Sequence, residues 1–152
     1  GVAAFDCSGD GVPDLAAAQN TAGTVALWRG THAADGADVS FAAPVAAAIN
    51  GSPISVTAGD FDLDGKPDLL SANFIPQSSP SGQNVSVVRN TTATGATGFT
   101  LDPVHTQSMQ IGTVFPAWPY DARAVDLNLD GRADLVSANY GQRSIAWRTN
   151  AM

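Results

Sequence analysis

Short apolar stretches separated by polar turns run through the whole chain. The stretches, of which "DLAAAQN", "DLLSAN" and "VSVV" are typical, are rich in small and β-branched residues and are bounded by Gly, Pro, Asn or Asp. They do not alternate strictly between apolar and polar positions, which favours strands that are covered on both faces. The alanines at 16–18 could fit a helix, but the same stretch in the other two copies reads "DLLSAN" and "DLVSAN". The pattern therefore predicts an all-β protein.

The most regular feature is an acidic unit that occurs three times. "DCSGDGVPDLAAAQN" begins at Asp6, "DFDLDGKPDLLSAN" at Asp60 and "DLNLDGRADLVSAN" at Asp126. Each unit is followed by a second apolar segment that ends in "VALWRGT", "VSVVRNT" or "IAWRTN". Such internal repetition predicts one supersecondary unit per copy: strand, acidic loop, strand, turn, strand, turn, strand. The repeats divide the chain at approximately 1–52, 53–118 and 119–152, the last of them incomplete.

Four-stranded antiparallel sheets packed face to face around an axis would cover both sides of these strands. This favours a β-propeller, with about three blades in this chain. Propellers usually have about four to eight blades, so we expect the chain to be part of a larger closed ring. The missing blades would come from another copy or from another chain, because an open arc would leave apolar blade faces in water. The first residue is Gly, which suggests a processed chain or a fragment.

Each acidic loop places oxygen-bearing side chains at regular positions. Position 1 is Asp, position 3 is Ser, Asp or Asn, positions 5 and 9 are Asp, and position 6 is Gly, which permits a tight backbone turn. The position-7 carbonyl can add another oxygen. A set of hard oxygen ligands without nitrogen or sulfur suits Ca²⁺, and we expect about three ions per chain. The candidate ligands are Asp6, Ser8, Asp10, Val12, Asp14, Asp60, Asp62, Asp64, Lys66, Asp68, Asp126, Asn128, Asp130, Arg132 and Asp134.

EF-hand loops share the opening of this pattern and are the alternative to be weighed. An EF-hand requires a bidentate acid at position 12, whereas that position here is Ala17, Ser71 or Ser137. It also requires a helix directly after the loop, whereas Pro13 and Pro67 precede strand-like sequence. The EF-hand interpretation is rejected on both counts.

The three units resemble FG-GAP (VCBS-type) repeats, which occur in the propeller heads of integrin α-subunits and in many secreted microbial and fungal proteins, lectins among them. The resemblance covers essentially the whole chain. It implies that each loop joins the first two strands of a blade, and that calcium stabilises the blade rather than acting in catalysis. The first copy departs from the pattern, because Ser8 stands in place of an acid or amide and Cys7 in place of the usual apolar residue. Its calcium site is expected to be the weakest.

Charge and composition exclude some partners. All fourteen acidic residues are Asp, ten of them lie in the three loops, and the formal net charge is −7. This charge argues against nucleic acid and anionic membranes as partners. No apolar stretch approaches the ~20 residues that span a bilayer, so membrane insertion is not expected. The single cysteine, Cys7, excludes an intrachain disulfide; we expect a small loop residue, or an exposed thiol able to pair with another chain.

Calcium-dependent loops predict a secreted, extracellular setting, where calcium is abundant enough for sites of modest affinity. Three N-x-[ST] sequons, at Asn50, Asn84 and Asn90, are compatible with secretion.

Candidates for catalysis are few, and we expect no enzyme activity. Outside the loops the only acids are Asp35, Asp38, Asp102 and Asp121, and the two histidines, His32 and His105, lie in different segments. No nucleophile-elbow or phosphate-loop pattern occurs.

Aromatic residues are better candidates for ligand binding. Trp–Arg pairs at 28–29 and 147–148 recur near the end of the third strand, and further aromatics follow "SAN" or lie in "FPAWPY". Aromatic faces together with Arg or Asn suit the apolar side and the hydroxyls of a sugar. Packing between blades is the alternative role. The candidates are Trp28, Arg29, Phe74, Trp118, Tyr120, Tyr140, Trp147 and Arg148.

The sequence thus predicts a calcium-stabilised extracellular binding or adhesion propeller whose favoured ligand is a glycan or glycoprotein. Two alternatives stay open: a propeller segment of a secreted polysaccharide-degrading enzyme such as a lyase, and a purely structural or protein-adhesion module.

Overall fold

The computed structural model describes residues 1–32, 38–49, 51–74, 84–110, 118–141 and 143–150, with the backbone alone for 84 and 103–110. All regular elements in these ranges are strands, so the predicted all-β class is confirmed. In this part of the chain no helix is long and apolar enough to cross a membrane.

The strands form three main antiparallel sheets and one small hairpin. The first sheet has the order β1 (Val2–Phe5), β2 (Asp14–Gln19), β3 (Thr24–Trp28) and β6 (Val45–Ala48). A hairpin of β4 (Gly30–His32) and β5 (Val39–Phe41) projects from it. The second sheet has the order β10 (Leu101–Gln110), β9 (Asn84–Asn90), β8 (Asp68–Phe74) and β7 (Ser52–Gly59). The third sheet comprises β11 (Pro119–Val125), β12 (Asp134–Asn139) and β13 (Ser144–Arg148).

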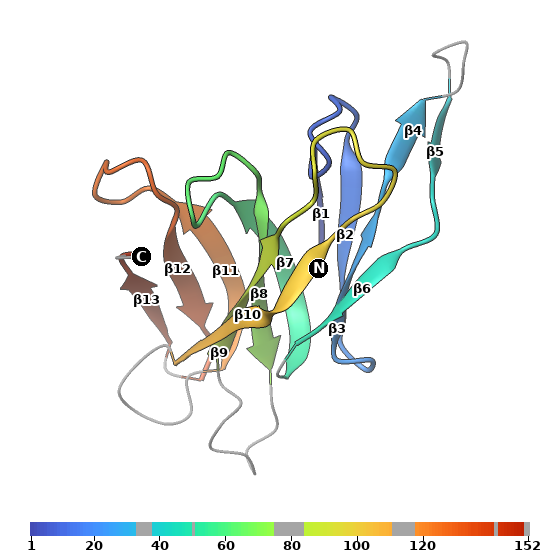
Figure 1. Cartoon of the computed structure of the whole chain (residues 1–152). Coiled ribbons are helices and arrows are strands. Elements are labelled where there is room, and N and C mark those ends of the chain that lie inside the picture. The colour runs from blue at the N-terminus through green and yellow to red at the C-terminus, as the bar shows by residue number, and fades with distance from the viewer. Residues whose placement is uncertain (33–37, 50, 75–83, 111–117, 142, 151–152) are drawn as a thin grey trace.

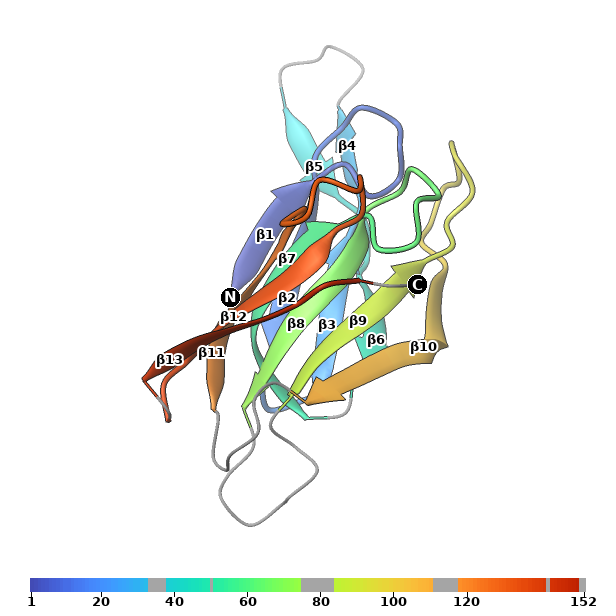
Figure 2. The same ribbon diagram turned by 90° about the vertical axis from the view of Figure 1, so that its left-hand side faces the viewer.

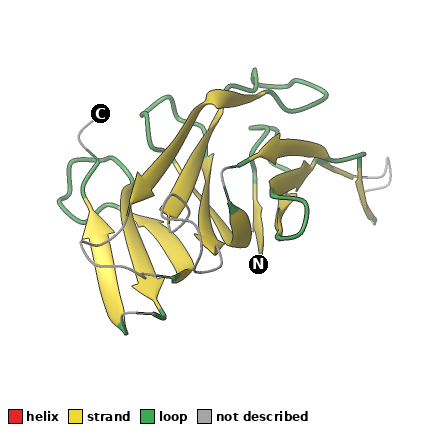
Figure 3. Cartoon of the chain, turned by 90° about the horizontal axis from the view of Figure 1, so that it is seen from below, coloured by secondary structure: helices red, strands yellow, loops and turns green. Residues whose placement is uncertain are grey.

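The three sheets are propeller-like blades that stand side by side (Figures 1 and 3). Their first strands, β1, β7 and β11, are neighbours, so one edge of each sheet faces the same region of the molecule. The three acidic loops join the first and second strands of their blades and lie at one end of the molecule (Figures 1 and 2). The sequence repeat is therefore also a structural repeat.

Strand register shows which residues are equivalent between blades. Ala17 pairs with Ala26 in the first blade, Ser71 with Ser86 in the second, and Ser137 with Ala146 in the third. This equivalence shows that the expected recurrence of the Trp–Arg pairs is wrong. Trp28 lies opposite Leu15, whose equivalent in the third blade is Leu135. Trp147, however, lies opposite Val136, the next residue along the strand. Because a shift of one residue turns a side chain to the other face of a strand, the two tryptophans are not equivalent.

Two apolar cores lie between blades. The first contains Val25 and Leu27 of the first blade against Leu69 and Val88 of the second, all fully buried. In the second core, the opposite face of the second blade packs against the third; its buried members are Phe61, Leu70, Ala72, Val85, Val87, Ala122 and Leu135. Each blade is thus held mainly by its neighbours, as in other repeat architectures.

Two further expectations are changed by burial. Cys7 is 1% exposed and belongs to the first core, so the expectation of an exposed thiol is wrong. Burial, together with the nearby carboxylates of Asp14, Asp68 and Asp6, raises the pKa of this thiol to about 12. Asn90 is fully buried, so its sequon is inaccessible in the folded chain. Asn50 and the side chain of Asn84 lie outside the described residues.

Candidate functional site

The position-9 aspartate is buried in all three acidic loops and accepts backbone hydrogen bonds on both of its carboxylate oxygens. One carboxylate oxygen of Asp14, Asp68 and Asp134 accepts from the position-2 backbone N–H: that of Cys7 (2.8 Å), Phe61 (3.1 Å) or Leu127 (2.9 Å). The other oxygen accepts from a backbone N–H at the end of the third strand or two residues beyond it: that of Gly30 (2.8 Å), Asn90 (2.8 Å) or Asn150 (2.7 Å). Hydrogen bonds to a charged group are stronger than those between neutral groups. Each position-9 aspartate therefore fixes its loop to its blade.

The position-1 aspartates organise the turn itself. One carboxylate oxygen of Asp6, Asp60 and Asp126 accepts from the N–H of the position-6 glycine, at 2.7, 2.9 and 2.8 Å. Those glycines have φ of 81–89°, the left-handed region in which a side chain is strained. This is the physical reason for the invariant Gly in the three copies.

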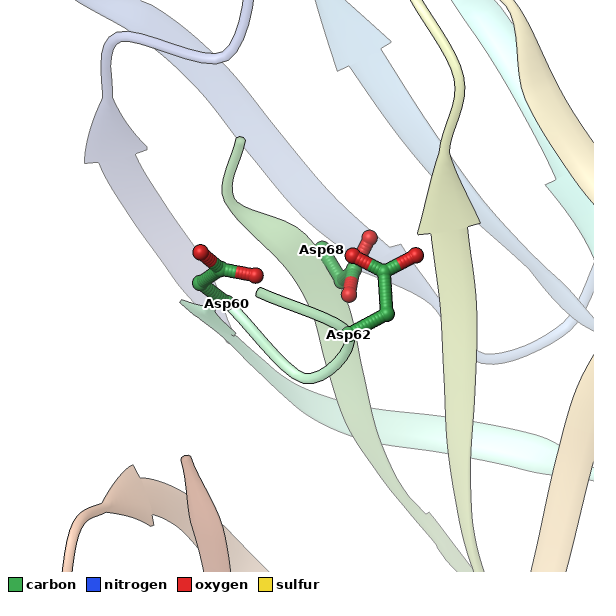
Figure 4. Close-up of side chains that lie close together, drawn as sticks. All are labelled: Asp60, Asp62 and Asp68. Atoms are coloured by element: carbon green, nitrogen blue, oxygen red, sulfur yellow. The ribbon is translucent and has the colours of Figure 1, made fainter. Parts of the chain in front are cut away.

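The second loop gathers its carboxylates most closely (Figure 4). Oxygens of Asp60, Asp62 and Asp68 lie within 4.8 Å of one another. Oδ1 of Asp60 is buried and has no hydrogen-bond partner among the residues that the structure describes. Calcium–oxygen bonds are about 2.3–2.6 Å, so two oxygens on one ion lie no more than about 5 Å apart. The unpartnered oxygen and this spacing fit a Ca²⁺ ion held by the three carboxylates.

Electrostatics in the second loop also favour a cation. The pKa of Asp68 is raised to about 6, chiefly by burial and also by the charges of Asp62 and Asp64, while the hydrogen bonds from the backbone of Asn90 and Phe61 lower it. A carboxylate whose charged form is destabilised by burial and by like charges gains most from a bound cation.

Basic side chains partly neutralise the loops, which sequence reasoning did not anticipate. Arg29 pairs with Asp10 at 2.6 Å in the first loop, and Arg89 pairs with Asp62 in the second. Lys66 lies 3.5 Å from Asp64. The sequence held a signal for these pairs: Arg29 directly follows β3, and Arg89 is the next-to-last residue of β9.

The first and third loops have the same framework without an equally tight cluster among the described residues. In the first loop Ser8 is buried and offers a hydroxyl where the second loop has a carboxylate. In the third loop Asn128 donates to Asp130 at 2.9 Å, and the pKa of Asp130 is lowered by the backbone N–H of Arg132 and by Asn128. The carbonyls of Val12, Lys66 and Arg132 belong to the same turns. The spacing of the ligands thus recurs three times, while the closeness of the carboxylates is greatest in the second copy.

The aromatic candidates separate into two groups. Phe74, Trp118, Tyr140 and Tyr120 form a chain of ring contacts, with centroids 6.2, 6.3 and 6.1 Å apart along it. They line an open hollow of about 1040 Å³, whose other lining residues, Ala138, Asn139, Arg143, Ser144 and Ile145, all come from the third blade. Trp28, Arg29, Trp147 and Arg148 are not among the residues of that hollow.

Sequence reasoning missed several residues that the structure brings to these sites. Asn90 reaches from the second blade to the Cys7 carbonyl (2.9 Å), and Asn150 reaches from the third blade to the Phe61 carbonyl (2.6 Å). Asn139 and Arg143 line the aromatic hollow. Of the acid–base candidates, His32 is exposed, and Asp35 and the His105 side chain lie outside the described residues.

Comparison with known proteins agrees with the repeat. Residues 6–71 match the family model described as an FG-GAP-like repeat. No curated protein and no solved structure matches the chain significantly. The matched segment begins at the first acidic loop and ends within β8, so it includes two of the three loops.

Proposed function

From the premise that residues 6–71 form an FG-GAP-like repeat, we propose that this chain is a calcium-stabilised extracellular propeller segment that binds carbohydrate. The observation that carries the metal part is the carboxylate cluster of the second loop, with its unpartnered Asp60 oxygen. The role of the ion is structural. It would offset the mutual repulsion of the loop carboxylates and tie the turn to the strand that begins at Asp68.

Calcium is tested by thermal unfolding of the full chain in millimolar CaCl₂, in MgCl₂ and after chelation. At a concentration 100 times the Kd, binding to the folded state alone adds about 2.7 kcal/mol to the free energy of unfolding. We expect Asp60→Asn to reduce the calcium-dependent rise in Tm. Asp121→Asn is the matched control, because Asp121 lies on β11, outside the loops, and pairs with Arg123 at 2.9 Å. An unchanged Tm after chelation would refute the metal proposal.

The number of ions is read from native mass spectrometry of the same samples. About three Ca²⁺ per chain, lost on chelation, is expected if all three loops bind. The first site is expected to lose its ion first, because Ser8 offers no carboxylate there.

Carbohydrate is proposed as the ligand because aromatic rings gather in a hollow with polar groups at its wall. Trp118 and Tyr140 lie nearly parallel, with 16° between their planes, and Tyr120 and Tyr140 are 63% and 69% exposed. Exposed rings of this kind suit the apolar face of a sugar. Immobilised polysaccharides separate the candidate functions: retention without product supports binding, release of product supports a degrading enzyme, and no retention supports a structural module.

Further blades are proposed as partners because both outer faces of the arc are apolar and open. Val2 and Leu15, on the outer face of the first blade, are 81% and 37% exposed, whereas their counterparts in the second blade, Val56 and Leu69, are 3% and 0% exposed. On the opposite side, Trp147 of the third blade is 68% exposed. Blades from another copy or another chain would cover both faces.

A further inference from the structure

The aromatic hollow contains two buried donors that have no acceptor. Nδ2 of Asn139 and Nε1 of Trp118 are buried and make no hydrogen bond within the described part of the chain, and both residues line the hollow. Asn139 is only 3% exposed. An unsatisfied buried N–H costs about 1–3 kcal/mol, and natural structures rarely leave one without a reason. Two such donors at one wall point to a ligand that supplies oxygen acceptors.

A single residue difference between the blades explains why Nδ2 of Asn139 is unpaired. In the second blade the equivalent Asn73 donates from Nδ2 to Oγ of Ser86 at 2.7 Å. In the third blade the residue at the Ser86 position is Ala146, which has no oxygen. Oδ1 of Asn139 still accepts from Ser137 at 3.2 Å, as Oδ1 of Asn73 does from Ser71 at 2.8 Å. Only the donor half of the amide is therefore free.

Backbone conformation sets this hollow apart from the rest of the blade. Trp118 and Arg143 have φ of 45° and 49°, and the only other non-glycine residues with positive φ in the described structure are Leu63 and Leu129 of the acidic loops. The left-handed region is uncommon for such side chains, and residues held there cluster at binding sites. Both strained residues line the hollow.

The charge of the hollow decides the class of ligand. Arg143 is its only charged lining residue, and no carboxylate pairs with that guanidinium among the described residues. An aromatic site for a cationic ligand would need the opposite sign of charge. Unpaired N–H donors and an unpaired guanidinium instead suit an oxygen-rich anion, because Arg binds carboxylates in a two-pronged geometry.

We propose that the hollow binds a sugar that carries a carboxylate, a uronate residue of an acidic glycan. This inference rests on the proposed carbohydrate binding and names its ligand class. The apolar face of the sugar ring stacks on Tyr140, and its oxygens accept from Asn139 and Trp118. The carboxylate pairs with Arg143. The site draws on two blades: Phe74 comes from β8 of the second blade, and Tyr120, Asn139, Tyr140 and Arg143 come from the third.

The test is ligand-observed NMR on the full chain in calcium, with methyl glycosides of glucuronate, galacturonate and mannuronate, each paired with its neutral parent sugar. We expect at least one uronate to bind about tenfold more tightly than its neutral parent, the effect of one charge-assisted contact. Arg143→Gln should remove that difference. Tyr140→Ala should abolish binding of both members of the pair.

Ala146→Ser tests the free amide. The new hydroxyl restores the partner that Ser86 provides in the second blade, so we expect three- to tenfold weaker sugar binding with an unchanged fold. Ala26→Ser is the matched control, because Ala26 holds the same register position in the first blade, away from the hollow. If both substitutions weaken binding equally, Asn139 does not contact the sugar and the proposal is overturned.

Failure of this inference is distinguishable from failure of the proposed function. Polysaccharide retention that is insensitive to Arg143→Gln and Tyr140→Ala would place the sugar elsewhere and overturn the uronate site, while carbohydrate binding would stand. Equal affinity for uronates and neutral sugars would overturn the acidic specificity alone. No retention of any glycan would overturn both.

Discussion

The second and third blades carry equivalent apolar faces whose surroundings differ. In the second blade the face is formed by Leu70, Ala72, Val85 and Val87, which are at most 6% exposed because the third blade covers them. The equivalent residues of the third blade are Val136, Ala138, Ile145 and Trp147. There Ile145 is 69% and Trp147 68% exposed.

The difference shows that burial in this protein is a property of neighbouring repeats rather than of a single repeat. The second and third strands pair in the same register in both blades, so local sequence decides that pairing. Whether the face is buried depends on a sheet that lies elsewhere in the chain. Substitutions at equivalent positions therefore measure what a neighbouring blade contributes.

The largest loss of stability is expected where the second blade packs most closely against the third. A Cβ added to Gly59 in β7 would stand 2.5 Å from Cβ of Ala124 and 3.1 Å from Cβ of Ala133. Gly59→Val should lower the free energy of unfolding by about 3 kcal/mol, because the third blade must move. Val125 holds the equivalent position in the third blade and is 42% exposed. Val125→Leu should change the stability by less than about 0.5 kcal/mol in the same urea titration.

The second pair compares side-chain loss at one register position. Val85→Ala should cost about 2 kcal/mol, since Val85 is fully buried and its removal leaves a cavity. Ile145→Ala at the exposed position should cost less than about 0.5 kcal/mol. Urea unfolding at fixed calcium measures both. Equal losses in dilute solution would show that the third face is covered as well.

The third pair compares the two asparagines that bridge blades. Asn90→Ala leaves the Cys7 carbonyl (2.9 Å) and the Pro67 carbonyl (3.2 Å) without this donor in a buried site, at a cost of about 2 kcal/mol. Asn150→Ala removes the bond to the Phe61 carbonyl in a half-buried site, and we expect about 1 kcal/mol. A larger loss at Asn150 would mean that the bridge between the second and third blades is the stronger one.

The smallest effect on folding is expected at the open face. Trp147→Lys should change the stability by less than about 0.5 kcal/mol, because Trp147 is 68% exposed. If further blades from other copies dock on this face, the same substitution should shift sedimentation toward the monomer. Association that persists unchanged in the variant would rule out this face as the contact.

The sequence by itself determined the repeating parts. Asp at positions 1 and 9 and Gly at position 6 specify the turn in each loop, since the contacts of Asp60 with Gly65 and of Asp68 with Phe61 join residues only a few positions apart. The short strands follow in the same way from small and β-branched residues between turns. This is why the amino-acid sequence alone predicts the all-β propeller class and the oxygen-lined loops.

Only the tertiary structure decided what lies between repeats. It buried the sequon at Asn90 and the thiol of Cys7, placed Trp28 and Trp147 at non-equivalent positions, and brought Phe74 beside Trp118. It also left Asn139 without the partner that Asn73 has. These outcomes depend on contacts between residues far apart in the chain and on strand registers that a shift of one residue reverses, and neither is encoded in any single repeat.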